Sequence, residues 1–262
     1  MSYNTIELNS EAGVATLTFN RPDRLNSFNG EMHSEIRAAF KAIRADESVR
    51  CLVITGSGRG FCAGQDLSDR DVSGDEPVDL GASLEKNYNP LVRNIMTMEM
   101  PVICAVNGVA AGAGANVALA CDIVIAARSA SFIQAFCRLG LVPDAGGTWT
   151  LPRLVGRSRA MGLAMLGDKI SAEKAEQWGM IWQCVDDDEL MPEVNKLAAH
   201  LATQPTKGLG YIKRAINASE SNDLDTQLDL ERDLQSMASS SHDYREGVQA
   251  FMNKRKPEFK GH

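Results

Sequence analysis

The stretch PVICAVNGVAAGAGANVALACDI, residues 101–123, decides the fold of this chain. It opens with an apolar run, Val102–Val106, bounded by Pro101 and an Asn-Gly pair, and this pattern predicts a buried strand. The turn that follows holds only small residues, so other backbone can approach it closely. Residues 116–120 then predict a helix whose first N–H groups have no partner inside the helix. Such a turn can present backbone donors to a negative oxygen, although a close-packed turn without a ligand has the same sequence.

A second stretch repeats this arrangement. Val49–Gly56 (VRCLVITG) also predicts a buried strand, and it runs into the glycine-rich segment SGRGFCAGQDL, residues 57–67. Two backbone N–H groups that converge on one oxygen form an oxyanion hole, which stabilises charge developing on a carbonyl. Phe61 breaks the G-x-G-x-x-G spacing, so a dinucleotide site is not indicated.

The rest of the chain predicts an α/β fold followed by helices. Residues 11–19 alternate as in a strand, and Asn29 can cap a helix whose apolar face is Met32, Ile36, Phe40 and Ile43. Residues 84–98 predict a helix that Pro90 interrupts, and residues 68–81 predict a polar loop. We therefore expect an α/β part over residues 1–200 and a helical part over 201–262. The predicted later strands are 122–127, 131–136 and 181–185, and the predicted C-terminal helices are 189–203, 207–218, 224–238 and 244–254.

The composition limits the partners and the compartment. The 27 basic and 34 acidic residues give a net charge of −7, which disfavours nucleic acid as the main partner. No apolar run approaches the roughly 20 residues of a membrane span, and no signal peptide is apparent, so we expect a cytoplasmic protein that does not engage a membrane. The six cysteines form no C-x-x-C pair and the four histidines are scattered, so we expect reduced thiols and no metal site.

Six motifs resemble one family over nearly the whole chain. They are NRP (20–22) with LNS (25–27), GFCAGQDL (60–67), NGVAAGAG (107–114), CDI (121–123) and GLVPDAGGT (140–148). Their order and spacing are similar to those of the enoyl-CoA hydratase/isomerase (crotonase) superfamily. The resemblance implies a spiral of ββα units, with C-terminal helices that build homotrimers, often paired into hexamers.

The resemblance also implies site residues. The oxyanion donors would be the N–H groups of Gln65 and Ala113. The acyl-CoA would be bound by two early segments and by residues near the acyl group, with two tail residues reaching the nucleotide of a neighbouring subunit. These candidates for CoA or substrate binding are Arg24, Leu25, Ala63, Asp66, Leu67, Asn116, Phe136, Phe259 and Lys260. For Arg24 and Lys260, a solvated surface charge is an equal alternative.

The residue that acts as acid or base decides which reaction the site can perform. Hydratases of the resembled family use two glutamates to split water, at the positions of Asn116 and Phe136, and neither residue is acidic here. Asp144 remains as the catalytic candidate, with a helix cap as its alternative role. One base and an oxyanion hole can shift a proton from the α-carbon of a thioester to a vinylogous carbon. The resemblance favours an isomerase acting on a ring-epoxide acyl-CoA, with a 3-enoyl-CoA as the alternative substrate and no cofactor apart from the CoA of the substrate.

Three other functions remain open: two enzymatic activities and one non-catalytic role. A dehalogenase of this family would need a histidine after the first oxyanion turn, and residues 67–100 contain none. A hydratase would need the two missing acids. A non-catalytic thioester-binding subunit would not need Asp144.

Overall fold

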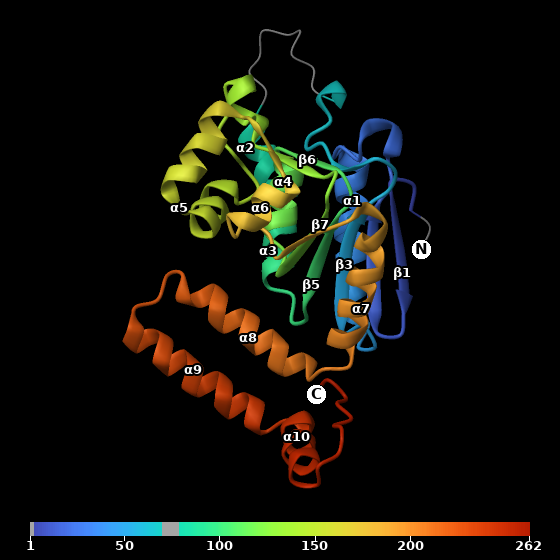
Figure 1. The fold of residues 1–262 in the computed structure, drawn as a ribbon, viewed down its shortest axis with the longest axis vertical. Coiled ribbons are helices and arrows are strands. Elements are labelled where there is room, and N and C mark those ends of the chain that lie inside the picture. Colours follow the sequence, from blue (N-terminus) through green and yellow to red (C-terminus); the bar gives the residue numbers. More distant parts are fainter. Residues whose placement is uncertain (1–2, 70–78) are drawn as a thin grey trace.

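The computed structural model describes residues 3–69 and 79–262, and its core is built from two sheets (Figure 1). The larger sheet has the strand order β1-β2-β3-β5-β7-β10. β1 and β2 are antiparallel, and every later pair in this sheet is parallel. The bounds are β1 Ile6–Glu11, β2 Val14–Phe19, β3 Cys51–Gly56, β5 Val102–Val106, β7 Ile123–Ala127 and β10 Gln183–Val185.

The smaller sheet has the strand order β4-β6-β8-β9. Its strands are β4 Gly60–Cys62, β6 Val109–Ala111, β8 Ser131–Ile133 and β9 Lys169–Ser171. The chain alternates between the two sheets, because β3 is followed by β4, β5 by β6 and β7 by β8. Such an alternation repeats along the chain, as expected for the predicted spiral. The predicted α/β class is confirmed.

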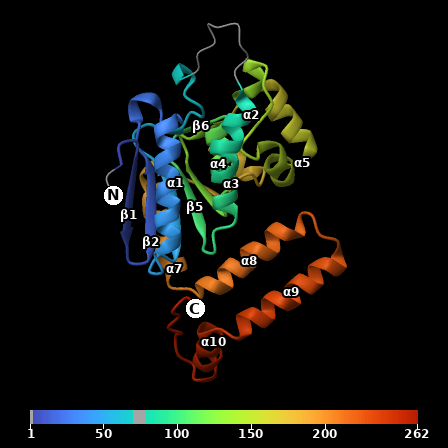
Figure 2. The same ribbon diagram turned by 180° about the vertical axis from the view of Figure 1, so that it is seen from behind.

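Helices cover both faces of the larger sheet. α1 and α3 lie on one face and α7 on the other, as the opposite views show (Figures 1 and 2). α1 begins as predicted, with the Asn29 side chain accepting a hydrogen bond of 2.8 Å from Met32 N, and its predicted apolar face is buried. The helical segments of this part are η1 Pro22–Arg24, α1 Gly30–Ala45, η2 Leu67–Asp69, α2 Leu80–Ser83, η3 Leu84–Tyr88, α3 Asn89–Met96, α4 Ala113–Leu119, η4 Ala135–Leu139, α5 Gly147–Leu166, α6 Ala172–Gln177, η5 Asp187–Glu189 and α7 Leu190–Ala202.

Three predicted segments differ from the structure. The strand predicted over 11–19 begins later, as β2, because Ala12 and Gly13 at positive φ form the turn of a hairpin whose first strand, β1, was not predicted. The strand predicted over 131–136 ends at Ile133, and Phe136 lies on the 3-10 helix η4. Residues 70–78 of the predicted loop lie outside the described residues. The break predicted at Pro90 is not seen, because α2, η3 and α3 follow one another without a gap and Tyr88 and Asn89 at their junction have helical φ and ψ.

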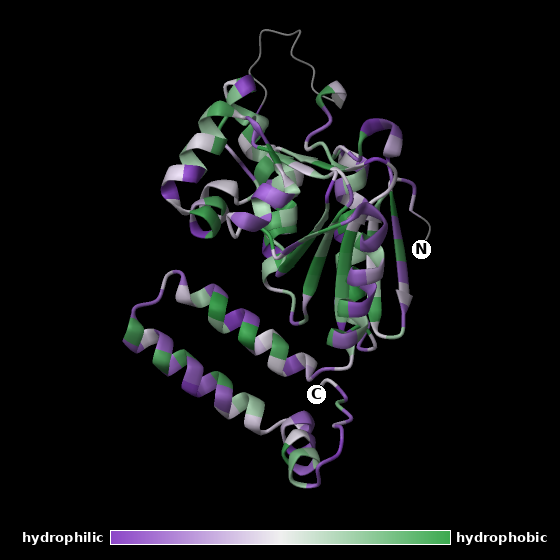
Figure 3. Ribbon diagram, viewed as in Figure 1, coloured by the Kyte–Doolittle hydropathy of each residue, from purple (hydrophilic) through white to green (hydrophobic). Residues whose placement is uncertain are grey.

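The last three helices form an arm that projects from the two-sheet core (Figure 1). They are α8 Thr206–Ser219, α9 Leu224–Ser239 and α10 His242–Met252, close to the predicted ranges. The ammonium of Lys213 fastens α8 to the core, since it donates to Asp122 Oδ2 at 2.8 Å and to the Ile95 carbonyl at 2.7 Å. Figure 3 shows apolar strands in the core and mixed apolar and polar positions along the arm. No helix in the described part of the chain is both long and apolar enough to cross a membrane.

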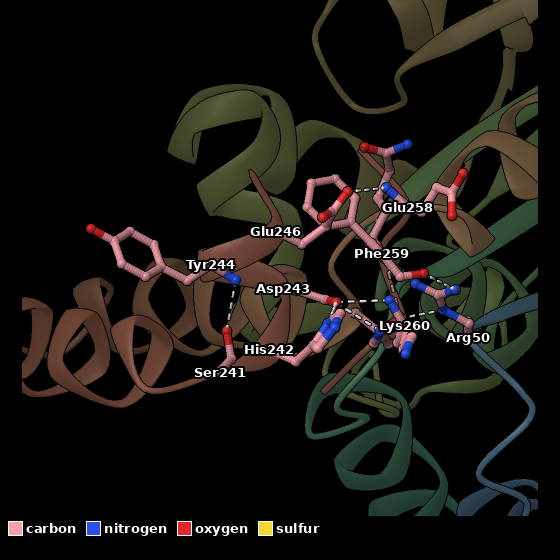
Figure 4. A network of polar contacts seen from close by, with 12 residues as sticks. Arg50, Ser241, His242, Asp243, Tyr244, Glu246, Glu258, Phe259 and Lys260 are labelled. Carbon is pink, nitrogen blue, oxygen red and sulfur yellow. Dashed lines mark hydrogen bonds and ion pairs between the residues drawn. The ribbon is translucent and has the colours of Figure 1, made fainter. Parts of the chain in front are cut away.

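The C-terminal tail returns to the core and to α10 through polar contacts (Figure 4). The buried carboxylate of Asp243 accepts hydrogen bonds of 2.7 Å from the N–H groups of Lys260 and Gly261. Glu246 accepts from the Arg255 guanidinium at 2.7 Å, and this hydrogen bond lowers the pKa of Glu246 to about 2. Arg50, at the start of β3, donates to the Phe259 carbonyl at 3.0 Å. The tail is therefore held at residues far apart in the sequence.

Candidate active site

The two glycine-rich turns meet because their strands are neighbours. β4 and β6 pair in parallel, so the turns that follow them leave the sheet at the same edge. A β-carbon on Gly64 would lie 2.9 Å from the Ala111 carbonyl oxygen and 3.4 Å from Ala113 N. One on Gly114 would lie 2.3 Å from the Cys62 carbonyl oxygen. Glycine is therefore required at both positions, and the main chain beside Gln65 touches the main chain that begins α4.

The predicted donors lie on either side of this contact. Ala113 is the first residue of α4, so its N–H has no partner four residues earlier in the helix. The Gln65 side chain is anchored, since Nε2 donates to the Phe28 carbonyl at 3.2 Å and to the Asp66 carbonyl at 3.1 Å. Its Oε1 accepts a hydrogen bond of 2.8 Å from the hydroxyl of Tyr88. These contacts fix the side chain of Gln65, whose N–H is the first predicted donor.

Asp144 lies in a tight turn directly before α5. Gly147 N donates to the Asp144 carbonyl at 2.8 Å, while Ala145 and Gly146 between them have φ of 48° and 78°. A non-glycine residue in this region stores strain of about 1–3 kcal/mol. The N-cap of α5 is Gly146, which makes no side-chain cap bond, and the Asp144 carbonyl accepts from Gly147, the first residue of the helix.

The positions that carry glutamates in hydratases hold neutral groups with other contacts. Asn116 is buried on α4, one turn after Ala113, and its Nδ2 donates to the Asp144 carbonyl at 2.8 Å. The Phe136 ring is buried against the second turn, because a β-carbon on Gly112 would lie 3.7 Å from its Cζ. The structure thus gathers Ala113, Asn116, Phe136 and the main chain of Asp144 around the start of α4.

The predicted CoA segments are joined to each other. Ala63 N donates to the Leu25 carbonyl at 2.9 Å, and Leu25 adopts a left-handed conformation with φ of 48°. Arg24 on η1 and Leu67 after the first turn are exposed. These four residues lie where a ligand could reach them along the edge of β4.

Asp66 has a different environment from the other predicted binding residues. It is buried and pairs with the Arg21 guanidinium at 2.9 Å, and its other oxygen accepts from the Ser68 hydroxyl at 2.7 Å. The hydrogen bond from Ser68 and the Arg21 contact hold the pKa of this carboxyl below its usual range. The side chain of Asp66 is therefore engaged in fixing the turn after Gln65.

The predicted tail residues do not join this site within one chain. Phe259 is bonded to Arg50, which precedes β3, and Lys260 to Asp243 on α10, whereas the predicted donors follow β4 and β6. Among residues 3–69 and 79–262, no group of three or more His, Cys, Asp or Glu side chains could hold a metal ion.

Sequence reasoning missed two residues that contact the site. Tyr88 lies within the helix predicted over 84–98 and was given no role, yet its hydroxyl donates to Gln65 Oε1. Gln134 is buried before η4 and donates from Nε2 to Asn116 Oδ1 at 2.8 Å. A polar residue inside an otherwise apolar segment was the available signal, but its partner is set by tertiary structure.

Comparison with known proteins agrees with this geometry. The family model for enoyl-CoA hydratase/isomerase matches residues 9–262. The chain is 64% identical over 252 residues to the 1,2-epoxyphenylacetyl-CoA isomerase of Escherichia coli (strain K12), covering 96% of both chains. It is 38% identical over 261 residues to the crotonyl-CoA hydratase of Syntrophomonas wolfei, covering 99% of both. The crystal structure of an enoyl-CoA hydratase from Bacillus anthracis has a TM-score of 0.93 and 31% identity, over 99% of this chain and 100% of that chain.

Proposed function

Because the chain belongs to the enoyl-CoA hydratase/isomerase family, whose members act on acyl-CoA thioesters, we propose that it converts 1,2-epoxyphenylacetyl-CoA into the oxepin-CoA in phenylacetate catabolism. One observation carries the choice of isomerase over hydratase. The main chain of Asp144 is fastened to α4, whereas Asn116 and Phe136 stand where a hydratase needs two acids. The identity to the Escherichia coli isomerase supports the ring epoxide as substrate.

In the proposed reaction, Asp144 acts as the single acid and base. Its carboxylate takes a proton from the CH₂ between the ring and the thioester, and the C–H electron pair forms the enolate. The N–H groups of Gln65 and Ala113 stabilise the enolate oxygen, and loss of one such donor typically costs roughly 3–4 kcal/mol. As the oxepin forms, the protonated Asp144 returns the proton to a ring carbon. Atoms and charge balance without water and without a cofactor apart from the substrate's CoA.

The CoA part of the substrate is assigned to the joined segments of β4 and η1. Arg24, Leu25, Ala63 and Leu67 would contact the CoA thioester, and the Ala63 N–H bond to the Leu25 carbonyl holds their two segments together. Asp66 would act through the shape of the turn, since its carboxylate is paired with Arg21. Phe259 and Lys260 would contribute from a neighbouring subunit.

A homotrimer, or a hexamer of two trimers, is part of the proposal, with residues 201–262 as the oligomerisation region. Apolar side chains of the arm support it, because Leu224, Leu228 and Met237 are exposed and Phe251 is 86% exposed. A cavity of about 470 Å³ beside Phe251 is lined largely by apolar groups of α10 and the tail. We assign the protein to the cytoplasm, where its six free cysteines would stay reduced. Analytical ultracentrifugation tests the assembly, and a stable monomer or dimer at micromolar concentration would refute it.

The catalytic proposal is tested with Asp144→Asn, which keeps the size of the side chain and removes its basicity. We expect turnover of 1,2-epoxyphenylacetyl-CoA to fall by about 100-fold or more, the usual scale of positioned general-base catalysis. Incorporation of solvent deuterium in heavy water should fall in parallel. A 3-enoyl-CoA assayed beside the ring epoxide decides between the two thioesters, since the same apparatus could shift its double bond.

Asp168→Asn is the matched control, because Asp168 is exposed just beyond the other end of α5. It should leave turnover and deuterium incorporation unchanged. A folded Asp144→Asn variant with near-normal isomerisation would show that Asp144 is not the base.

A further inference from the structure

A buried pair of amides supports the main chain of Asp144. Asn116 on α4 is 1% exposed, and Gln134 before η4 is 4% exposed. Gln134 Nε2 donates to Asn116 Oδ1, and Asn116 Nδ2 donates to the Asp144 carbonyl, both at 2.8 Å. The chain of contacts thus runs from the end of β8 through α4 to the turn before α5. At this burial, Asn116 offers almost no surface to a ligand.

The Asp144 carbonyl decides which way the Asn116 amide faces. The oxygen and nitrogen of an amide are nearly equal in size, so packing alone does not select the orientation. Because a carbonyl oxygen can only accept, Asn116 Nδ2 must face it, and Oδ1 is then directed to Gln134 Nε2. Loss of Gln134 would therefore leave the buried Asn116 Oδ1 without its donor and weaken the hold on the amide.

Gly147 holds the amide from its other side. A β-carbon on Gly147 would lie 2.2 Å from Asn116 Nδ2 and 2.6 Å from its Cγ. Any side chain at residue 147 would push the amide away from its place. The Asn116 amide is therefore confined between Gln134, the Asp144 carbonyl and the α-carbon of Gly147.

We propose that Asn116 and Gln134 are positioning residues that set the location of the Asp144 carboxylate relative to the oxyanion donor at Ala113, an inference that rests on the proposed function. Asn116 and Ala113 are on the same short helix, α4. One rigid element therefore positions both the proposed base, through Asn116, and the proposed donor at Ala113. The turn at Asp144 contains Ala145 at φ 48°, and a strained turn needs such support to keep one conformation. A displacement of about 1 Å at a reacting group can cost about 100-fold in rate.

Three variants disturb the pair from different sides. Asn116→Asp keeps the shape but as a carboxylate has no proton to donate to the Asp144 carbonyl, Gln134→Leu removes the donor to Asn116 Oδ1, and Gly147→Ala displaces the amide. For each we expect kcat to fall by about 10- to 100-fold. KM and the Kd of phenylacetyl-CoA, which lacks the epoxide, should change by less than about twofold, because the oxyanion turns and CoA segments are untouched. The kinetic isotope effect with substrate deuterated at the α-carbon should rise, since proton transfer becomes slower relative to other steps.

Gly162→Ala is the matched control for Gly147→Ala. Both glycines lie in α5, and a β-carbon on Gly162 would meet nothing within 4 Å. This variant should keep the kcat and the isotope effect of the wild type.

The outcomes separate this inference from the proposed function. If Asp144→Asn is inactive while folded Asn116→Asp and Gln134→Leu variants keep wild-type kcat and isotope effect, the positioning role is wrong and the base assignment stands. If Asp144→Asn is active, the base assignment fails first. Failure of all three variants to fold would assign the amide pair a structural role and overturn the inference.

Discussion

Replacing Lys213 with methionine should destabilise the protein by leaving the partly buried carboxylate of Asp122 without its cation. The Lys213 side chain is 8% exposed, and its ammonium lies 2.8 Å from Asp122 Oδ2, which also accepts from Val102 N at 2.8 Å. Removing one partner of a buried pair costs about 3–5 kcal/mol. Asp122 is 24% exposed, so water solvates part of the abandoned charge and we expect the lower end, about 3 kcal/mol. For a chain of this size that loss corresponds to a fall in Tm of about 6–12 °C.

The loss should depend on pH in a defined direction. Burial raises the pKa of Asp122 above its ordinary value even with Lys213 beside it, and removal of Lys213 must raise this pKa further. An acid whose pKa is higher in the folded state stabilises the fold while it is protonated, and this contribution is lost as the pH rises through the folded pKa. The free energy of unfolding of Lys213→Met should therefore approach that of the wild type more closely at about pH 5 than at pH 7.

Urea unfolding followed by tryptophan fluorescence at both pH values measures the effect. The double variant Asp122→Asn with Lys213→Met carries neither charge, so it should recover much of the loss seen in the single variant at pH 7. Lys207→Met, at an exposed position of the same helix, should stay within about 0.5 kcal/mol of the wild type. Equal destabilisation of the single and double variants, with no dependence on pH, would refute the charge argument and assign the loss to other contacts of α8.

Three further predictions concern the site and the tail. Tyr88→Phe removes the hydroxyl that donates to Gln65 Oε1. We expect kcat to fall by about 10-fold, which is part of the cost of losing an oxyanion donor, while the Kd for phenylacetyl-CoA stays unchanged. An unchanged kcat would contradict this. A 2-enoyl-CoA should not be hydrated at a rate comparable with isomerisation, because Asn116 and Phe136 cannot hold and split water, and a spectrophotometric assay for loss of the enoyl thioester checks it. Glu246→Gln weakens the contact with the tail, so trypsin should cleave near the C-terminus faster than in the wild type, and equal cleavage rates would show that the contact does not hold the tail.

Local patterns were sufficient for much of the fold. The strands at β3 and β5 were predicted because buried parallel strands are continuous apolar runs, and α1 because Asn29 provides a cap. The hairpin of β1 and β2 was missed because the residues of β1 are mostly exposed, so no apolar run marked it. Phe136 was assigned to a strand because its neighbours are apolar, but the chain leaves the sheet after Ile133.

The candidate site was predictable to the extent that it is local. The glycine-rich turns that contain Gln65 and Ala113 were predicted because each follows a buried strand, whereas the choice of these two N–H groups came from the family resemblance. The closeness of the two turns required the parallel pairing of β4 and β6. The contacts of Tyr88 with Gln65 and of Gln134 with Asn116 join residues from different elements. Spacing along the chain contains no information about such partners, so these contacts required the tertiary structure.

The close contact between the turns after β4 and β6 has a consequence for how such a protein diverges. Gly64 and Gly114 leave no room for a β-carbon, so most substitutions at these two positions would separate the proposed oxyanion donors and be eliminated by selection. In the proposed mechanism, the groups that select the reaction are side chains at residues 116, 136 and 144, which can be exchanged without rebuilding that main chain. Descendants of one ancestor would inherit the two turns unchanged. Mutations of the few side chains around the turns could then give these descendants different chemistry.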